Sequence, residues 1–288
     1  MTTLFALVRA LHFAGLMTVF GASALLFQAR PVGVDGKALK APLCLAALAA
    51  LVTAALSLGF VAQDMTGDAR AFGDLHMLAA VVTASFYGKI FLWRIFLLLG
   101  LCLACAAPGF HLPKALVAGA ALALPGLTSH AAAAGPAQYE VARAGIDALH
   151  LLAAGFWVGG LVVLAREMLA RPRDTQRLVA LLRLFSRWGT VSVAVLLAAG
   201  TLNAVAILAP QGMRWSETYI TLLALKIVLA AVMVALALTN RFGVLPGLAR
   251  GEPEAEDTIP LTVLAELSCA VLILLLVGFL GLTAPMQM

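Results

Sequence analysis

Charged residues are scarce in this chain, and several sequence patterns are missing altogether. Lys, Arg, Asp and Glu make up 11% of the 288 residues, whereas a soluble globular domain carries about 25%. Short segments of alternating polar and apolar residues, from which membrane β-barrels are built, are absent. So are the nucleotide-binding glycine loop, the zinc-protease motif and the nucleophile elbow of hydrolases. These absences exclude a soluble domain and a barrel, and no pattern indicates an enzyme.

Long apolar runs are abundant instead. Hydrophobic residues make up 63% of the chain, and runs of about 20 recur from end to end, each long enough to cross about 30 Å of hydrocarbon. Only helices satisfy the backbone of such runs inside a bilayer. We therefore predict one all-α transmembrane domain, 1–288, a polytopic helix bundle with about eight spans. The predicted spans are 4–29, 41–62, 90–108, 112–131, 139–166, 187–209, 217–241 and 258–283.

Two segments need separate interpretation. The first apolar run is too long for a signal-peptide core and contains Arg9 and His12, so we expect a membrane span rather than a cleaved signal. The segment 72–86 is apolar but only about 15 residues long, which is short for a span. We predict an interfacial or re-entrant helix there, with a ninth full span as the alternative.

The basic residues predict the orientation of the bundle. Most of the 19 lysines and arginines lie in the connections after the first, third, fifth and seventh spans, and positively charged loops stay in the cytoplasm. Both termini are therefore expected outside the cytoplasm. The net charge of +5 follows from this topology and gives no indication of nucleic-acid binding.

An internal repeat is one interpretation of the first and fifth spans. Arg9-Ala-Leu-His12 is followed by Gly21, nine residues after the histidine, and Asp147-Ala-Leu-His150 is followed by Gly159 at the same offset. Both spans run inward, as expected if four helices were duplicated in parallel. A chance match in a chain rich in Ala and Leu is the alternative.

Polar side chains gather at one depth of the predicted membrane. A charge near the bilayer centre costs roughly 2.5–3.5 kcal/mol on insertion scales, so each such group is a candidate for function. At about 1.5 Å per residue, His12 lies about 12 Å, His150 about 17 Å, Lys226 about 14 Å and Asn203 about 10 Å from the outer ends of their spans. His130 lies at the outer mouth of the fourth span. These depths place the groups in one layer in the outer half of the bilayer.

This layer predicts a metal site. Asp147 and His150 are three residues apart, so they share one face of a helix, and a carboxylate next to an imidazole orients it as a metal ligand. Imidazole nitrogen suits copper and zinc. The candidate ligands are His130, His150, Asp147 and His12, with His76 as a further candidate next to an aqueous loop. The alternative is that each histidine bonds to a neighbouring backbone or hydroxyl group and only packs helices together.

Four other polar or sulfur groups have less specific interpretations. Lys226 is expected to neutralise Asp147. Glu266 either relays protons or pairs with an arginine at the cytoplasmic rim. Cys102 and Cys105 share a helix face near the cytoplasm, where they would offer an exit site for Cu(I) or would simply pack as small apolar residues.

The sequence resembles the copper resistance protein D (CopD) family of bacterial inner-membrane proteins. The resemblance rests on Arg9-Ala-Leu-His12-Phe-Ala-Gly15, on Ser129-His130-Ala131, and above all on Asp147-Ala-Leu-His150-Leu-Leu-Ala-Ala-Gly155-Phe-Trp157-Val-Gly159-Gly160. It continues through Phe185-Ser186-Arg187, Gly200-Thr-Leu-Asn203, Leu225-Lys226 and Asn240-Arg241-Phe242, and covers essentially the whole chain. The family implies copper handling across the inner membrane, often with a periplasmic copper-binding partner (CopC). The histidine- and methionine-rich tail of some relatives is reduced here to Met286-Gln-Met288.

These observations together predict a protein that moves copper from the periplasm to the cytoplasm. His130 is expected to capture the ion at the outer mouth, and His150, Asp147 and His12 are expected to form the intramembrane site. Two alternatives remain. Transmembrane histidines also ligate haem iron in b-type cytochromes, and a membrane protein of this kind can serve as a non-transporting assembly factor for a copper enzyme.

Overall fold

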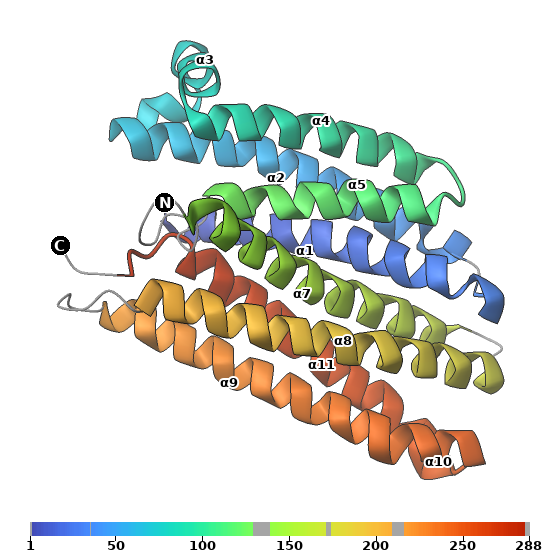
Figure 1. The fold of residues 1–288 in the computed structure, drawn as a ribbon. Helices are drawn as coiled ribbons and strands as arrows, with labels where there is room; N and C mark the ends of the chain where they lie inside the picture. The colour runs from blue at the N-terminus through green and yellow to red at the C-terminus, as the bar shows by residue number, and fades with distance from the viewer. Residues whose placement is uncertain (1, 35, 129–138, 171–173, 209–215, 286–288) are drawn as a thin grey trace.

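The computed structural model describes residues 2–34, 36–128, 139–170, 174–208 and 216–285, and within these ranges the chain is helical with no β-strand. The long helices lie side by side in one bundle (Figure 1). Their bounds are α1 Thr2–Gln28, α2 Lys40–Thr66, α4 Phe86–Ala106, α5 His111–Ala123, α7 Glu140–Leu169, α8 Thr175–Leu208, α9 Glu217–Thr239 and α11 Pro253–Leu280; α3 Leu75–Ala84 and α10 Leu245–Arg250 are short. The all-α polytopic fold predicted from the sequence is confirmed.

Seven of these helical segments are long and apolar enough to cross a membrane. They correspond to seven of the eight predicted spans, with some differences in length. The largest difference is at α8, which begins at Thr175 rather than at residue 187, because the helix continues beyond the apolar run into a segment with Arg177 and Arg183.

The remaining predicted span, 112–131, is shorter than expected. It consists of α5 followed by a turn of 3₁₀-helix, η4, at Leu124–Thr128. Its start lies near the α1–α2 connection, because a Cβ atom on Gly36 would come within 2.6 Å of His111 Cε1. Its end packs near the start of α7, where a Cβ atom on Gly126 would lie 2.8 Å from the carbonyl oxygen of Ala144. About 17 helical residues reach about 25 Å, so α5 and η4 run most of the length of the bundle (Figure 1).

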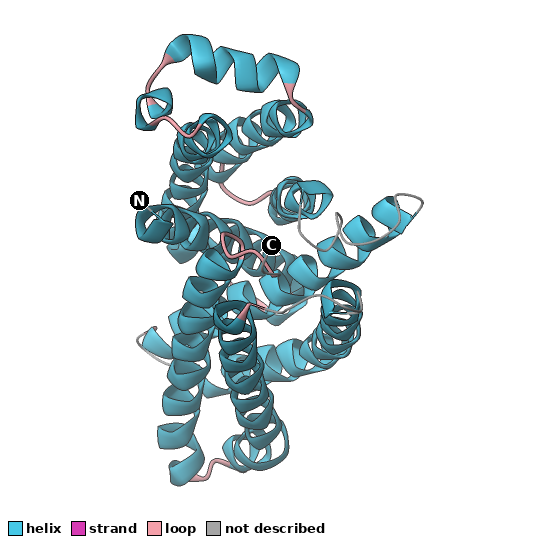
Figure 2. Cartoon of the chain, turned by 90° about the vertical axis from the view of Figure 1, so that its left-hand side faces the viewer, coloured by secondary structure: helices cyan, strands magenta, loops and turns pink. Residues whose placement is uncertain are grey.

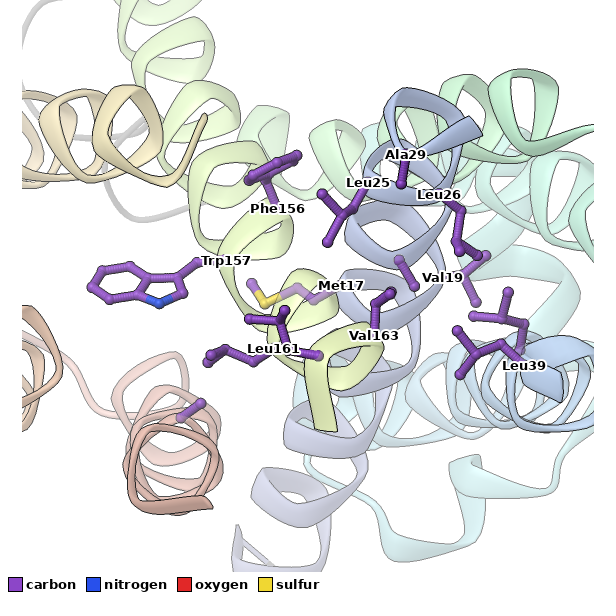
Figure 3. Packing of buried hydrophobic residues seen from close by; sticks show 14 of the residues in the cluster. Met17, Val19, Leu25, Leu26, Ala29, Leu39, Phe156, Trp157, Leu161 and Val163 are labelled. Carbon is purple, nitrogen blue, oxygen red and sulfur yellow. The ribbon is translucent and has the colours of Figure 1, made fainter. Parts of the chain in front are cut away.

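Helix α1 is the centre of the molecule. It packs against α2, α5, α7 and α11, and apolar side chains such as Met17, Val19 and Leu161 fill the space around it (Figure 3). Helices α1 and α7 cross at glycines, since a Cβ atom on Gly159 would lie 2.6 Å from Gly21 Cα. Only glycine allows so close an approach of two helix backbones.

Most helix contacts repeat in the two halves of the chain, whereas the packing of α2 against α4 has no comparable α8–α9 contact among the described residues. The packing of α1 against α2, α1 against α5 and α4 against α5 is matched by α7 against α8, α7 against α11 and α9 against α11. Gly21 and Gly159, which occupy equivalent positions in the two segments, meet at the α1–α7 crossing. Equivalent residues meet in this way close to a two-fold axis, so the packing supports the parallel four-plus-four repeat.

Helix α3 lies across the ends of α2 and α4 (Figures 1 and 2). It has ten residues, of which only Val81 is buried, and Asp74 caps its N-terminus by accepting from the backbone N–H groups of His76 and Met77. Ten helical residues extend about 15 Å and do not cross a bilayer. The interfacial assignment of 72–86 stays a prediction.

Candidate metal-binding site

His150 is held between α7 and α8. Its Nδ1 lies 3.2 Å from the carbonyl oxygen of Leu196. A carbonyl only accepts, so Nδ1 carries the proton and donates, which leaves a lone pair on Nε2 of the neutral ring. A backbone bond of this kind at one ring nitrogen is the usual support of a histidine that binds metal through the other. Gly200 leaves room for the ring, because a Cβ atom there would lie 3.1 Å from His150 Cε1.

Asp147 lies one turn before His150 and also faces α8. Its Oδ1 accepts a hydrogen bond of 3.0 Å from Nδ2 of Asn203. Lys226 of α9 interacts electrostatically with both Asp147 and His150. The structure therefore brings together Asp147, His150, Asn203 and Lys226. The sequence placed the last three at one depth and Asp147 on the same helix face as His150. The expected compensation of Asp147 by Lys226 fits this arrangement.

His12 occupies the equivalent place in the first half of the chain. It is buried, and its Nδ1 lies 2.9 Å from the carbonyl oxygen of Ala50 on α2 and 3.3 Å from Oγ1 of Thr53. As at His150, the carbonyl assigns the proton to Nδ1 and leaves Nε2 with a lone pair. The charged groups that act on His12 are Arg94 and Arg9. His12 is thus anchored to α2 among cations, whereas His150 is anchored to α8 near a carboxylate.

The structure places one of the two other predicted ligands. His76 is exposed at the start of α3, and the carboxylate of Asp74 caps that helix through backbone bonds. His130 lies outside the described residues. Within the described ranges no group of three or more His, Cys, Asp or Glu side chains is arranged to hold a metal ion, so the convergence of these ligands on one ion stays a prediction.

The three cysteines of α2 and α4 are reduced and mostly covered. Cys102 and Cys105 follow each other by one turn on α4, and Cys44 of α2 lies within electrostatic range of both. Cys105 is buried in the core. The described part of the chain shows no metal-binding arrangement that includes them, and packing remains the simpler interpretation.

A second polar centre surrounds Glu266 in the half of the bundle toward α10. Glu266 is 2% exposed; its Oε2 accepts from Trp157 Nε1 at 3.0 Å and its Oε1 accepts from Asn240 Nδ2 at 2.8 Å. Thr262 Oγ1 in turn donates to Asn240 Oδ1 at 2.6 Å. In Figure 3 the Trp157 indole extends from α7 on the side away from α1. The described hydrogen-bond partners of Glu266 are therefore neutral groups, and not an arginine, which was one of the two expectations from the sequence.

This network borders a cavity of about 130 Å³ among α7, α8, α9 and α11. Arg241 contributes to the lining and donates through Nη1 to the carbonyl oxygen of Ser186 at 3.0 Å and to Oγ1 of Thr190. Asn240 and Arg241 lie in a π-helical turn, Asn240–Val244, at the end of α9. Such turns often occur at functional sites. Sequence reasoning gave a polar role to Glu266 but did not connect it with Trp157 and Asn240, because these partners lie on two other segments of the chain.

Sequence reasoning missed Arg94. It lies on α4, is 7% exposed, and acts electrostatically on His12 and Arg9. The sequence did contain an indication: Arg94 is a lone arginine in an apolar run. Like Lys226 in the seventh predicted span, a charged residue in such a run is a candidate for function.

Comparison with known proteins identifies the group to which the chain belongs. Residues 1–141 match the family model of the copper resistance protein D-like N-terminal domain, and residues 179–280 match that of copper resistance protein D. Copper resistance protein D of Pseudomonas syringae pv. tomato is 32% identical over 258 residues, 83% of this chain and 82% of the relative. Inner membrane protein YebZ of Escherichia coli K12 is 28% identical over 288 residues, 96% of this chain and 97% of the relative. No solved structure gives a significant match. The chain is a multi-pass inner-membrane protein and belongs to the copper resistance protein D family.

Proposed function

We propose that the protein moves copper from the periplasm toward the cytoplasm through an intramembrane site centred on His150. The observation that carries the proposal is the state of the His150 ring, whose Nδ1–H is held by the Leu196 carbonyl and whose Nε2 lone pair is left for a ligand. Imidazole nitrogen is a ligand that copper accepts readily. Asp147, three residues away on the same face of α7, supplies the negative charge that a cation requires.

The other predicted ligands have distinct parts in the proposal. His130 captures copper at the outer mouth, and His76 assists from the periplasmic side. His12 presents a second Nε2 lone pair in the outer half of the bundle. A periplasmic CopC-like protein is the proposed donor. Support for these assignments comes from the residue types and from membership in the copper resistance protein D family.

Lys226 sets a condition on copper binding. In the empty site its ammonium group interacts with Asp147, so it competes with copper for the carboxylate. A bound cation and Lys226 repel each other. Copper therefore binds when the Asp147 carboxylate exchanges its interaction with Lys226 for one with the ion. This competition lowers the affinity of the site for copper, so that the ion can be released.

Copper content of the purified protein tests the proposal. We expect His150→Ala to lose most of the copper retained after reconstitution and washing, and Asp147→Asn to weaken retention by about 10-fold, the loss typical of a group that orients a metal ligand. His111→Gln is the matched control, because His111 lies at the opposite end of the bundle on α5 and should leave copper content unchanged. Full copper stoichiometry in His150→Ala would show the site assignment to be wrong. A haem absorption band in the purified protein would instead support the b-type cytochrome alternative and contradict the copper proposal.

A further inference from the structure

Three buried nitrogen atoms near the outer end of the bundle lack a partner. Within the described ranges, Nε of Arg9, Nε of Arg94 and Nε2 of His12 are buried and have no hydrogen-bond acceptor or donor. Arg94 is 7% exposed and His12 is 4% exposed. Arg9 and His12 are three residues apart, so they share one face of α1. The three side chains form what we call the arginine–histidine cluster.

The cluster has positive charge without a compensating carboxylate. The groups that act electrostatically on Arg9 are the Tyr87 side chain and Arg94, and Tyr87 also acts on Arg94. Ion pairs in the described ranges lie elsewhere, at Arg177–Glu167 and Arg250–Glu252. Buried charges in proteins are normally paired, and an unpaired one inside a bilayer is especially costly. Two guanidinium groups that interact electrostatically, each with a buried and unpartnered Nε, therefore require a negative charge that the described side chains do not supply.

The second half of the chain shows where that charge belongs. Arg9 precedes His12 by three residues, as Asp147 precedes His150. Arg94 lies on α4 and acts on His12, as Lys226 lies on α9 and acts on His150. Both histidines donate from Nδ1 to a carbonyl of the following long helix, at Ala50 and Leu196. The two halves thus share a histidine and a cation, but a carboxylate completes the second half and an arginine stands in its place in the first.

We propose that Arg9 and Arg94 bind a small monovalent anion at the arginine–histidine cluster, where it supplies the negative charge that the Asp147 carboxylate supplies in the second half. Guanidinium groups are suited to this task because they remain charged and present several N–H donors in one plane. The site lies about 10 Å below the outer end of α1. That depth favours a small mobile anion such as chloride over the phosphate of a lipid headgroup, which stays at the membrane surface.

The anion has a consequence for His12. A metal cation at Nε2 of His12 would lie next to two guanidinium groups and would be repelled by both. With the anion in place, one positive charge is neutralised and the local field is weaker. The anion site itself does not depend on copper, and its test uses the copper-free protein.

Binding of radiolabelled chloride to the purified full chain in detergent tests the proposal. We expect saturable binding of one chloride per chain, with sodium gluconate used to hold the ionic strength constant. Arg94→Gln should weaken this binding by about 10-fold or more, because a charge-assisted bond is lost. Arg70→Gln is the control, since Arg70 is an exposed arginine of η3 at Ala69–Phe72, and it should bind chloride as the wild type does.

A second variant keeps the test decisive if Arg94→Gln folds poorly. Arg9→Asp places in the first half the carboxylate found in the second. We expect it to lose chloride binding and to be at least as heat-stable without chloride as the wild type is with it. Equal chloride binding by the wild type, Arg94→Gln and Arg9→Asp would overturn the proposal. Absence of chloride binding by the wild type, or release of a tightly bound phospholipid that is lost in Arg94→Gln, would overturn it as well, the latter in favour of a lipid phosphate.

Discussion

At the scale of the residue, the depth of each polar side chain in the membrane was predictable from the sequence, but the neighbouring helix that it faces was not. Counting residues along each span placed His12 and His150 in the same layer, and the structure holds both by the same Nδ1-to-carbonyl bond. The rotation of each helix decides which neighbour a side chain meets, and an apolar run carries little information about rotation. His12 therefore faces α2 and Arg94, which no spacing in the sequence indicated.

The Glu266 network gives a prediction at this scale. Trp157→Phe removes the indole N–H that donates to Oε2 of Glu266 and leaves a buried carboxylate oxygen without that donor. The expected cost is about 1–3 kcal/mol, measured as a lower midpoint of heat-induced aggregation in detergent.

Trp93→Phe is the matched control for that change. Trp93 is 62% exposed on the surface of α4, so the loss of its indole N–H should leave the midpoint unchanged. An equal loss of stability in the two variants would show that the Trp157–Glu266 bond contributes nothing specific.

At the scale of the element, apolar length predicted the existence of the helices, and polar extensions shifted their ends. The bilayer requires backbone hydrogen bonds inside each span, which is why long apolar runs such as 41–62 and 217–241 became helices. The same rule says nothing about where a helix stops in water. Helix α8 accordingly continues through Arg177 and Arg183, where amphipathic packing rather than membrane burial maintains it.

The α1–α7 crossing gives a prediction at the scale of the element. A Cβ atom on Gly159 would lie 2.4 Å from the backbone nitrogen of Ala22 and 2.6 Å from Gly21 Cα. Backbone atoms cannot move aside as a flexible side chain does, so Gly159→Ala must push the two helices apart. Overpacking of this kind costs about 1–3 kcal/mol or more, and we expect a clear fall in the heat-aggregation midpoint.

Gly145→Ala is the control on the same helix. A Cβ atom on Gly145 would meet no atom within 4 Å, and alanine is the better helix former by roughly 0.8–1.0 kcal/mol. The midpoint should therefore stay constant or rise. A fall of the same size in Gly145→Ala and Gly159→Ala would mean that helix contact at Gly21 is not the cause.

At the scale of the whole molecule, the two halves share an architecture and differ in charge. The matched helix contacts and the meeting of Gly21 with Gly159 explain why the histidine segments at 9–12 and 147–150 look alike. Four matching positions alone did not separate a repeat from chance. The difference that matters for function, Arg9 against Asp147, was visible in the sequence, but its meaning depends on the cations that α4 and α9 bring next to each histidine.

The orientation of the bundle gives the last prediction. The first turns of α1 lie next to the end of α11, because Arg9 packs against Gly281, so the two ends of the described chain face the same side of the membrane. The excess of lysine and arginine in the opposite loops predicts that this side faces the periplasm. In a variant whose four free cysteines, Cys44, Cys102, Cys105 and Cys269, are replaced by alanine, single cysteines at Thr3 and Arg70 should react with an impermeant maleimide in intact spheroplasts. A cysteine at Glu254, an exposed position at the opposite end on the first turn of α11, should react only after lysis, and the reverse pattern would invert the direction of copper movement proposed above.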